Sequence, residues 1–358
     1  MTGGHGAHSG AGRAAAAPDA EFRADLGAWL WPDRSGPGGP EPHRGRLLLP
    51  EDYLTESAEP PELGWQRLAF RLGARRVGPG RRELRHRAWY RLIRRSMSSP
   101  KVIAVFSAKG GVGKSTTAAE LGHVLAAVRG EMIAALDANP DSGNLVKRVR
   151  EPYSVFSAVE LGRDASRLAR HSDILPYVTQ ADSGLSVIRS DPAAAARLGP
   201  GAYQRIVRAL SRFYLVIIAD LGTGIRDPAF LALMEAADGV VAVTEPTFDA
   251  AEVVIEGIDW LGRLFPAKIG AGTVVLNGIV PGRTGVDVGR LAEEFGKHMA
   301  RVARVPWDRH LATGGVPQWP LLARHTQDAY LQLAAAIIDG LPDQPGTAPD
   351  DTAAPDDT

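Results

Sequence analysis

The sequence predicts an α/β fold in which a doubly wound, mostly parallel sheet carries helices on both faces. The first observation is that apolar runs alternate with helix-length segments from Lys101 to about Leu341. The second is that these runs are apolar throughout, as expected of parallel strands that are buried on both faces. The third is a change of composition at both ends of this region, which separates a folded domain from its appendages.

Each element of the domain is predicted from its own segment. Six runs are expected to form strands, in chain order KVIAVFS, MIAALD, LSVI, YLVIIAD, VVAVT and TVVLN. Five segments have the length and apolar spacing of covering helices, namely STTAAELGHVLAAVR, AYQRIVRALSRF, DAAEVVIEGIDWLGRLF, VGRLAEEFGKHM and QDAYLQLAAAIIDGL. Helices between successive strands are the crossover connections that parallel strands require.

Composition divides the chain into four regions. Residues 1–61 are rich in Gly, Ala and Pro and are expected to be disordered, whereas residues 62–100 are basic and are expected to form an amphipathic helical segment. Residues 101–341 form the α/β domain, and residues 342–358 are an acidic tail that is also expected to be disordered. The formal net charge of zero therefore hides two oppositely charged appendages.

The basic region between residues 64 and 97 holds eleven arginines against a single acid, Glu83. Leu84, Ala88 and Leu92 recur every four residues, which predicts a basic helix with one apolar face. Three roles remain open for it. The helix docks on a protein partner or membrane-associated machine, it binds DNA phosphates nonspecifically, or it packs on the α/β domain.

The composition also excludes several kinds of site and location. There are no cysteines, which excludes disulfides, thiolate zinc sites and iron–sulfur ligation by this chain. No apolar run reaches the roughly 18 to 20 residues that a transmembrane helix needs. We therefore expect no transmembrane segment and a cytoplasmic protein, in which any membrane contact is peripheral, at the inner face.

A glycine-rich turn lies between the first predicted strand and a helix, in the string SAKGGVGKSTT. Its backbone N–H groups can surround a phosphate, and the helix that follows adds its positive N-terminal dipole. Lys114 is expected to reach the β and γ phosphates, and Ser115 to ligate Mg²⁺. The predicted phosphate-binding residues are Lys109, Gly110, Gly111, Val112, Gly113, Lys114, Ser115 and Thr116.

Lys109 follows Ala108, which stands where the ordinary GxxxxGK[ST] motif has its first glycine. The string resembles the deviant Walker A motif, KGGxGK[ST], of the MinD/ParA family of P-loop ATPases, and the resemblance covers about residues 101–340. It implies that the chain binds ATP with Mg²⁺ and hydrolyses it to ADP and phosphate. It also implies an ATP-dependent homodimer in which Lys109 contacts the phosphates that the other subunit binds.

Four further strings resemble motifs of the same family. In DANPDSGN, the resemblance places Asp137 near the magnesium ion, whereas Asn139 replaces an acid that polarises the attacking water in related ATPases. Because an amide cannot accept that proton, hydrolysis is expected to be slow or partner-stimulated. Asp220 ends an apolar strand, as is typical of the Walker B acid that faces the metal. The resemblance also places Asn277 and Pro306 at the adenine.

Within that family, the chain most resembles the actinobacterial MinD-like ATPases that accompany type VII secretion systems, which share strings such as DSGNL and PWDRH. This resemblance implies a regulatory ATPase that regulates or positions a partner assembly, with a secretion machine as the expected partner. The alternative is a ParA-type ATPase that binds DNA nonspecifically during chromosome or plasmid partitioning. DNA binding of that kind weakens steeply with salt, whereas a docked apolar helix tolerates salt better.

Overall fold

A computed structural model describes residues 79–139, 144–149, 154–191, 198–280 and 285–342. The predicted disordered regions, residues 1–61 and nearly all of the acidic tail, lie outside these ranges, as do residues 62–78 of the basic segment and Pro140–Gly143 of the DANPDSGN string. None of the helices in the described ranges combines the length and the apolar composition needed to span a membrane.

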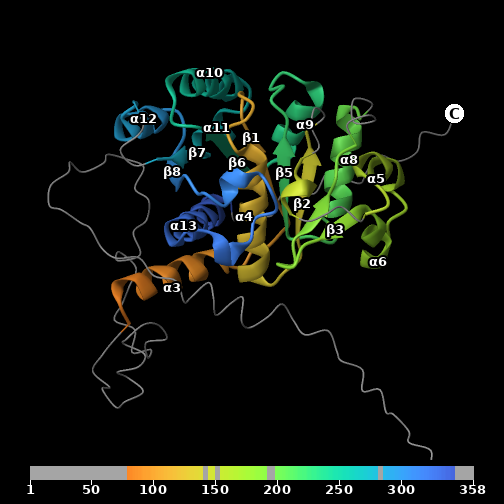
Figure 1. Cartoon of the computed structure of the whole chain (residues 1–358). Coiled ribbons are helices and arrows are strands. Elements are labelled where there is room, and N and C mark those ends of the chain that lie inside the picture. Colours follow the sequence, from red (N-terminus) through yellow and green to blue (C-terminus); the bar gives the residue numbers. More distant parts are fainter. Residues whose placement is uncertain (1–78, 140–143, 150–153, 192–197, 281–284, 343–358) are drawn as a thin grey trace, which may run out of the picture.

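Eight strands form one sheet in the order β3-β4-β2-β5-β1-β6-β7-β8, in which every pairing is parallel except that of β3 with β4 (Figure 1). The strands are β1 Lys101–Phe106, β2 Ile133–Ala138, β3 Val178–Gln180, β4 Ser186–Ile188, β5 Val216–Leu221, β6 Gly239–Thr244, β7 Thr273–Ile279 and β8 Arg301–Pro306. The predicted doubly wound, mostly parallel α/β fold is therefore confirmed.

Helices cover both faces of this sheet. The α-helices are α3 Arg81–Ile93, α4 Lys114–Arg129, α5 Ala158–Asp164, α6 His171–Ile174, α8 Pro200–Leu210, α9 Pro228–Ala236, α10 Phe248–Leu264, α11 Pro266–Gly270, α12 Val288–Phe295 and α13 Arg324–Gly340. Four 3₁₀ turns complete the described elements, η2 Val146–Arg148, η3 Leu175–Tyr177, η4 Leu311–Thr313 and η5 Trp319–Leu321.

The core divides into two layers because successive strand side chains point to opposite faces. In β1, Ile103 and Val105 pack against α3, α4 and α13, whereas Val102, Ala104 and Phe106 pack against the side that carries α8, α9 and α10. All six residues of β1 are buried, as are all six of β2 and of β5. This explains why the central strands have apolar runs in place of an alternating pattern.

The sheet contains two strands that the sequence analysis did not predict, β3 and β8. Strand β3 is only three residues long, and β8 carries the arginines Arg301 and Arg304 at an edge of the sheet. Short strands and edge strands bury little apolar surface, so the apolar run that marks a central strand is missing. Helices α5 and α9 were also not predicted.

Helix α3 lies within the predicted basic segment and packs on α13 and α4 (Figure 1). The sequence predicts that Leu84, Ala88 and Leu92 form the apolar face of this helix. Ala88 is buried, but Leu84 and Leu92 are only half-buried. The most buried stripe instead consists of Arg82, His86, Trp89 and Ile93. In the described residues, the packing of α3 on the α/β domain is thus partly polar.

Candidate nucleotide-binding site

The glycine-rich turn connects β1 to α4 at the carboxyl edge of the sheet, as its sequence predicts. Gly111 and Gly113 have φ angles of 84° and 87°, a region that residues with a Cβ atom rarely adopt. A Cβ atom at Gly113 would also lie 2.1 Å from Nδ2 of Asn277. Glycine at position 113 therefore permits both the turn and the close approach of β7, whose Asn277 donates a hydrogen bond to the Val112 carbonyl at 2.8 Å.

Inside the turn, the ammonium group of Lys114 lies 2.5 Å from Oδ1 of Asp220. Asp220 is fully buried at the end of β5, and its side chain faces this lysine because β5 is the neighbour of β1. The second carboxylate oxygen of Asp220, Oδ2, has no hydrogen-bond partner among the described residues. A buried, unpaired carboxylate oxygen is costly unless a cation or a donor reaches it.

Asp137 stands beside Asp220, since the two residues are register partners in the β2–β5 pairing. Its oxygens accept hydrogen bonds from the backbone N–H groups of Asn139 at 3.2 Å and Leu145 at 3.0 Å. Burial, and secondarily the charge of Asp220, raises the pKa of Asp137 to about 7. Among the described residues, Lys114 is the one lysine beside these two buried carboxylates, which leaves this part of the site short of positive charge.

These groups fit a magnesium ion. Carboxylate and hydroxyl oxygens are its preferred protein ligands, and the unpartnered Asp220 oxygen marks where positive charge is missing. Ser115, at the first turn of α4, and the two aspartates are the residues that would hold the ion, directly or through water. When bound, Mg²⁺ neutralises charge on the β and γ phosphates.

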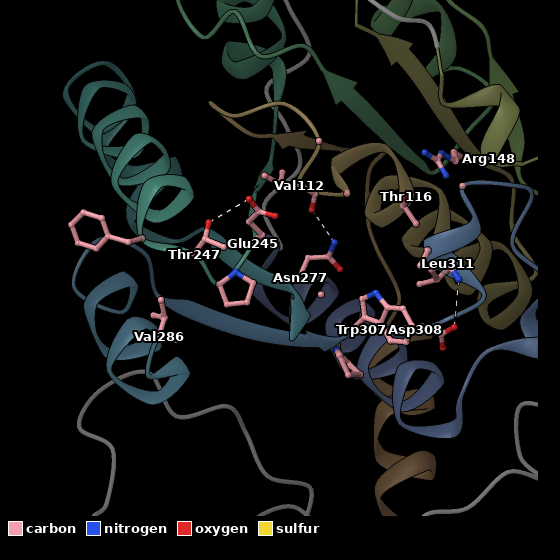
Figure 2. A pocket seen from close by; sticks show the side chains of 18 of the residues that line it. Val112, Thr116, Arg148, Glu245, Thr247, Asn277, Val286, Trp307, Asp308 and Leu311 are labelled. Atoms are coloured by element: carbon pink, nitrogen blue, oxygen red, sulfur yellow. Dashed lines mark hydrogen bonds between the residues drawn. The ribbon is translucent and has the colours of Figure 1, made fainter. Parts of the chain in front are cut away.

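The other loop lysine, Lys109, has a different environment. Its ammonium group lies 3.5 Å from Oε1 of Glu245, and the two side chains are 34% and 40% exposed. Glu245 follows β6, at the mouth of the pocket described next (Figure 2). Within one chain, the ammonium group of Lys109 is therefore directed to Glu245 by a partly exposed ion pair.

A pocket of about 550 Å³ opens beside the glycine-rich turn (Figure 2). Its walls come from the turn itself, the corner between β6 and α10, the ends of β7 and β8, η2 and η4. The lining residues are Gly111, Val112, Gly113, Thr116, Arg148, Glu245, Pro246, Thr247, Phe248, Asn277, Gly278, Gly285, Val286, Pro306, Trp307, Asp308, Leu311, Ala312 and Gly314. Apolar walls with a few convergent polar groups are typical of sites for small ligands and cofactors.

One wall of the pocket is shaped by the carboxylate of Asp308. Oδ1 accepts the N–H of His310 at 2.8 Å, and Oδ2 accepts the N–H of Ala323 at 2.8 Å. Burial works to raise the pKa of Asp308, but these backbone hydrogen bonds outweigh it and lower the pKa below its usual value. The loop after β8 is consequently fixed at both ends by one side chain.

The structure brings together most of the residues that the sequence singled out. Lys114, Asp137 and Asp220 converge at the buried end, and Asn277 and Pro306 line the pocket, while Asn139 lies next to Asp137. In contrast, the ammonium group of Lys109 pairs with Glu245, whereas that of Lys114 pairs with Asp220. Their roles in nucleotide binding and hydrolysis remain predictions.

Sequence reasoning missed Glu245 and Arg148, which line the pocket together with Trp307 of the PWDRH string. Trp307 follows directly on Pro306, so the PWD string was a usable signal. Arg148 lies in a turn after β2, and no spacing in the sequence relates it to the loop after β8. Only the folded arrangement brings these segments to one pocket.

Residues 103–313 match the CobQ/CobB/MinD/ParA nucleotide binding domain family. The chain is 34% identical over 252 residues to the ESX-1 secretion-associated protein EspI of Mycobacterium tuberculosis, a match that covers 69% of this chain and 38% of EspI. It is 26% identical over 248 residues to an uncharacterised ATP-binding protein of Methanocaldococcus jannaschii, covering 66% of this chain and 87% of that protein.

Among solved structures, a ParA family ATPase from Chlorobium tepidum superposes with a TM-score of 0.54 at 21% identity, covering 67% of this chain and 97% of that one. At this identity the likeness concerns the fold. It agrees with the sheet and the glycine-rich turn described above.

Proposed function

The chain belongs to the CobQ/CobB/MinD/ParA nucleotide-binding family, and on this premise we propose that it is an ATP-dependent molecular switch. Mg-ATP brings two copies together, the pair engages a partner assembly, and hydrolysis to ADP and phosphate releases the partner. Nucleotide binding is the property for which the family is named. Beyond nucleotide binding, the proposed switch has three properties, namely the pairing of two copies, the hydrolysis of ATP and the engagement of a partner.

The different environments of the two loop lysines carry this proposal. Lys114 is 8% exposed and faces the buried aspartates, where the phosphates of its own nucleotide would lie. Lys109 is 34% exposed, and its one ion pair among the described residues is with the half-exposed Glu245. An exposed pair of this kind is worth less than about 1 kcal/mol. A triphosphate bound to a second copy, with several charged oxygens, is a stronger partner for Lys109.

Hydrolysis by this switch is proposed to be slow. Asn139 is 9% exposed and its backbone N–H donates to Asp137, which supports a position for its side chain near the phosphates of a bound nucleotide. Its amide can orient a water molecule but cannot accept a proton from it. An asparagine at position 139 in place of an acid therefore favours a long-lived ATP-bound pair. Contact with the partner would then stimulate hydrolysis and separate the pair.

The partner is proposed to be a protein secretion assembly. EspI is named as a protein associated with ESX-1 secretion, and it is the relative with which this chain shares 34% identity. Helix α3 presents Arg81 and Arg91 to solvent, which supports an anionic surface on the partner. The same arginines also suit nucleic-acid phosphates, so ParA-like DNA binding is the second candidate; it predicts a steep loss of binding with added salt.

The first test is the mass of the protein in solution, measured by light scattering with Mg-ATP and with Mg-ADP. We expect a dimer with Mg-ATP and a monomer with Mg-ADP. The variant Lys109→Ala should bind Mg-ATP, because Lys114 is intact, yet remain a monomer.

A matched control is Lys297→Ala, which removes an exposed lysine that pairs with Glu294 away from the pocket. This variant should dimerise like the wild type. A wild-type protein that binds Mg-ATP and stays monomeric, or a Lys109→Ala variant that dimerises normally, would refute the pairing mechanism.

A further inference from the structure

Arg148 is a pocket residue to which neither the family resemblance nor the site described above gives a role. It ends the 3₁₀ turn η2, is half-buried, and lines the pocket on the side of α4 (Figure 2). In the described part of the chain, its guanidinium group has no carboxylate within ion-pair distance. A positive group without an acidic partner that faces a ligand pocket is available for the ligand.

The backbone holds Arg148 in place. The N–H of Leu145, three residues earlier, is fixed on Oδ2 of Asp137 at 3.0 Å, and the N–H of Arg148 donates to the Leu145 carbonyl at 3.0 Å. On the other side, Gly314 adopts a left-handed φ of 72°, and a Cβ atom there would lie 3.4 Å from Nη1 of Arg148. The guanidinium group thus lies against the loop after β8.

The position of Arg148 indicates which part of a nucleotide it meets. The phosphates belong at the glycine-rich turn and at Lys114, whereas Arg148 stands beyond Thr116, with Leu311 and Ala312 as neighbours in the lining. Figure 2 places Thr116 between Val112 of the turn and Arg148, and Leu311 on the same side of the pocket as Arg148. This end of the pocket is flanked by the apolar side chains of Leu311 and Ala312, which suit a flat base better than a phosphate.

We propose that Arg148 is a nucleotide-binding residue that stacks its planar guanidinium group on the base of the bound nucleotide. The proposal rests on the proposed function, since it assumes that the pocket takes ATP or ADP. A guanidinium group combines a planar surface, a positive charge and weak hydration, which are the properties needed to stack on an aromatic ring. The contact is common to ATP and ADP, so Arg148 strengthens the binding of both without distinguishing them.

The test compares Arg148→Ala, Arg148→Lys and wild type by calorimetric titration with ADP, ATP and inorganic tripolyphosphate. We expect Arg148→Ala to weaken ADP and ATP binding equally, by about three- to thirtyfold, the range of a partly desolvated cation–π contact. Arg148→Lys should not restore the affinity, because the lysine ammonium group has the positive charge but no planar surface that can stack on the base. Tripolyphosphate, which has no base, should bind all three proteins alike.

Arg167→Ala, which removes an arginine with an 84% exposed side chain outside the pocket, is the control and should bind like the wild type. Far-ultraviolet circular dichroism of each variant establishes that the fold is retained. Unchanged ADP affinity in Arg148→Ala would overturn the proposal. So would full recovery in Arg148→Lys together with weaker tripolyphosphate binding, which would indicate a phosphate contact. Failure of the wild type to bind any adenine nucleotide would instead refute the proposed function.

Discussion

Gly113 is the residue at which the site tolerates least change. Two features exclude a side chain at this position. Its φ is 87°, and a Cβ atom there would lie 2.1 Å from Nδ2 of Asn277. Gly113→Ala should therefore displace Asn277 from the Val112 carbonyl and distort the phosphate-binding turn. We expect loss of measurable ATP binding in a titration, with a stability cost of about 1–2 kcal/mol from the backbone alone.

Gly184→Ala is the matched control for this prediction. Gly184 has nearly the same φ, 89°, but a Cβ atom there would meet nothing within 4 Å. The control should lose similar stability and bind ATP normally. Equal loss of ATP binding in both variants would show that strain, and not the contact with Asn277, governs the site.

Glu120, on α4, is a buried acid whose titration should be visible in the stability of the protein. It is 1% exposed, and burial, together with the charge of Asp308, raises its pKa from 4.5 to about 8. The native state therefore keeps a proton that the unfolded state loses above pH 4.5. Its contribution to stability is complete below that pH and is lost as the pH rises to about 8, a change on the order of 4 kcal/mol.

Glu120→Gln keeps the shape of the side chain and removes this titration. Urea unfolding at several pH values should show the variant gaining stability relative to wild type between pH 5 and pH 8. A difference between the two proteins that stays constant over this range would mean that Glu120 is ionised in the folded state.

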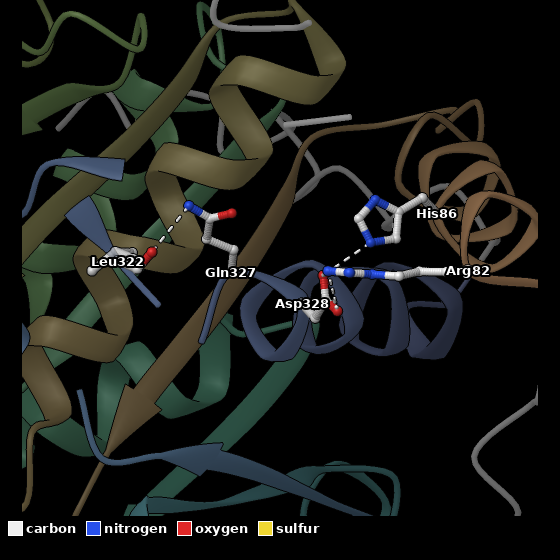
Figure 3. A network of polar contacts seen from close by, with 5 residues as sticks. All are labelled: Arg82, His86, Leu322, Gln327 and Asp328. Atoms are coloured by element: carbon white, nitrogen blue, oxygen red, sulfur yellow. Dashed lines mark hydrogen bonds and ion pairs between the residues drawn. The ribbon is translucent and has the colours of Figure 1, made fainter. Parts of the chain in front are cut away.

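At the scale of elements, one carboxylate, that of Asp328, is the centre of the polar part of the contact between α3 and α13. Asp328 accepts from Nη2 of Arg82 at 3.2 Å and pairs with Nε2 of His86 at 2.9 Å (Figure 3). The arginine and histidine side chains are 9% and 3% exposed. Removal of the Asp328 carboxylate leaves the buried Arg82 and His86 side chains without this partner. The resulting loss of folding free energy is larger than that from breaking a surface ion pair.

Asp328→Ala should therefore destabilise the protein by about 3 kcal/mol in urea unfolding and make α3 more sensitive to trypsin. The neighbouring residue Gln327 donates from Nε2 to the carbonyl of Trp319 at 2.8 Å. It also donates to the carbonyl of Leu322 at 3.3 Å (Figure 3). Asp339→Ala, later on the same helix, provides the comparison because Asp339 makes no ion pair with described residues. Equal stabilities of the two variants would contradict the role given to Asp328.

At the scale of the whole molecule, the sequence was sufficient to predict those strands in which every residue is buried. The central strands β1, β2 and β5 are buried at every residue, so their apolar runs identified them and the doubly wound sheet. Strand β8 was missed because it carries arginines at an edge. Likewise, Lys114 was placed by the motif around it, whereas Glu245 and Arg148 reach the pocket through contacts between distant segments, which leave no local pattern.

The lifetime of the proposed ATP-bound pair is a property of the molecule as a whole. In the proposed function, Asn139, which lies beside the buried Asp137, takes the place of a carboxylate that would accept the proton of the attacking water. Asn139→Asp should therefore raise the rate of ATP hydrolysis by about a hundredfold or more, the lower end of what a positioned base contributes. The dimer formed with Mg-ATP should then decay correspondingly sooner in time-resolved light scattering.

Asn144→Asp introduces the same charge in the same segment, at a side chain whose oxygen accepts from Lys147 at 3.4 Å. It should change neither the rate nor the lifetime, because the new carboxylate replaces no proposed catalytic group. If Asn139→Asp leaves both quantities at the wild-type values, Asn139 does not limit hydrolysis. The lifetime of the ATP-bound state must then be set by another step, such as separation of the two copies.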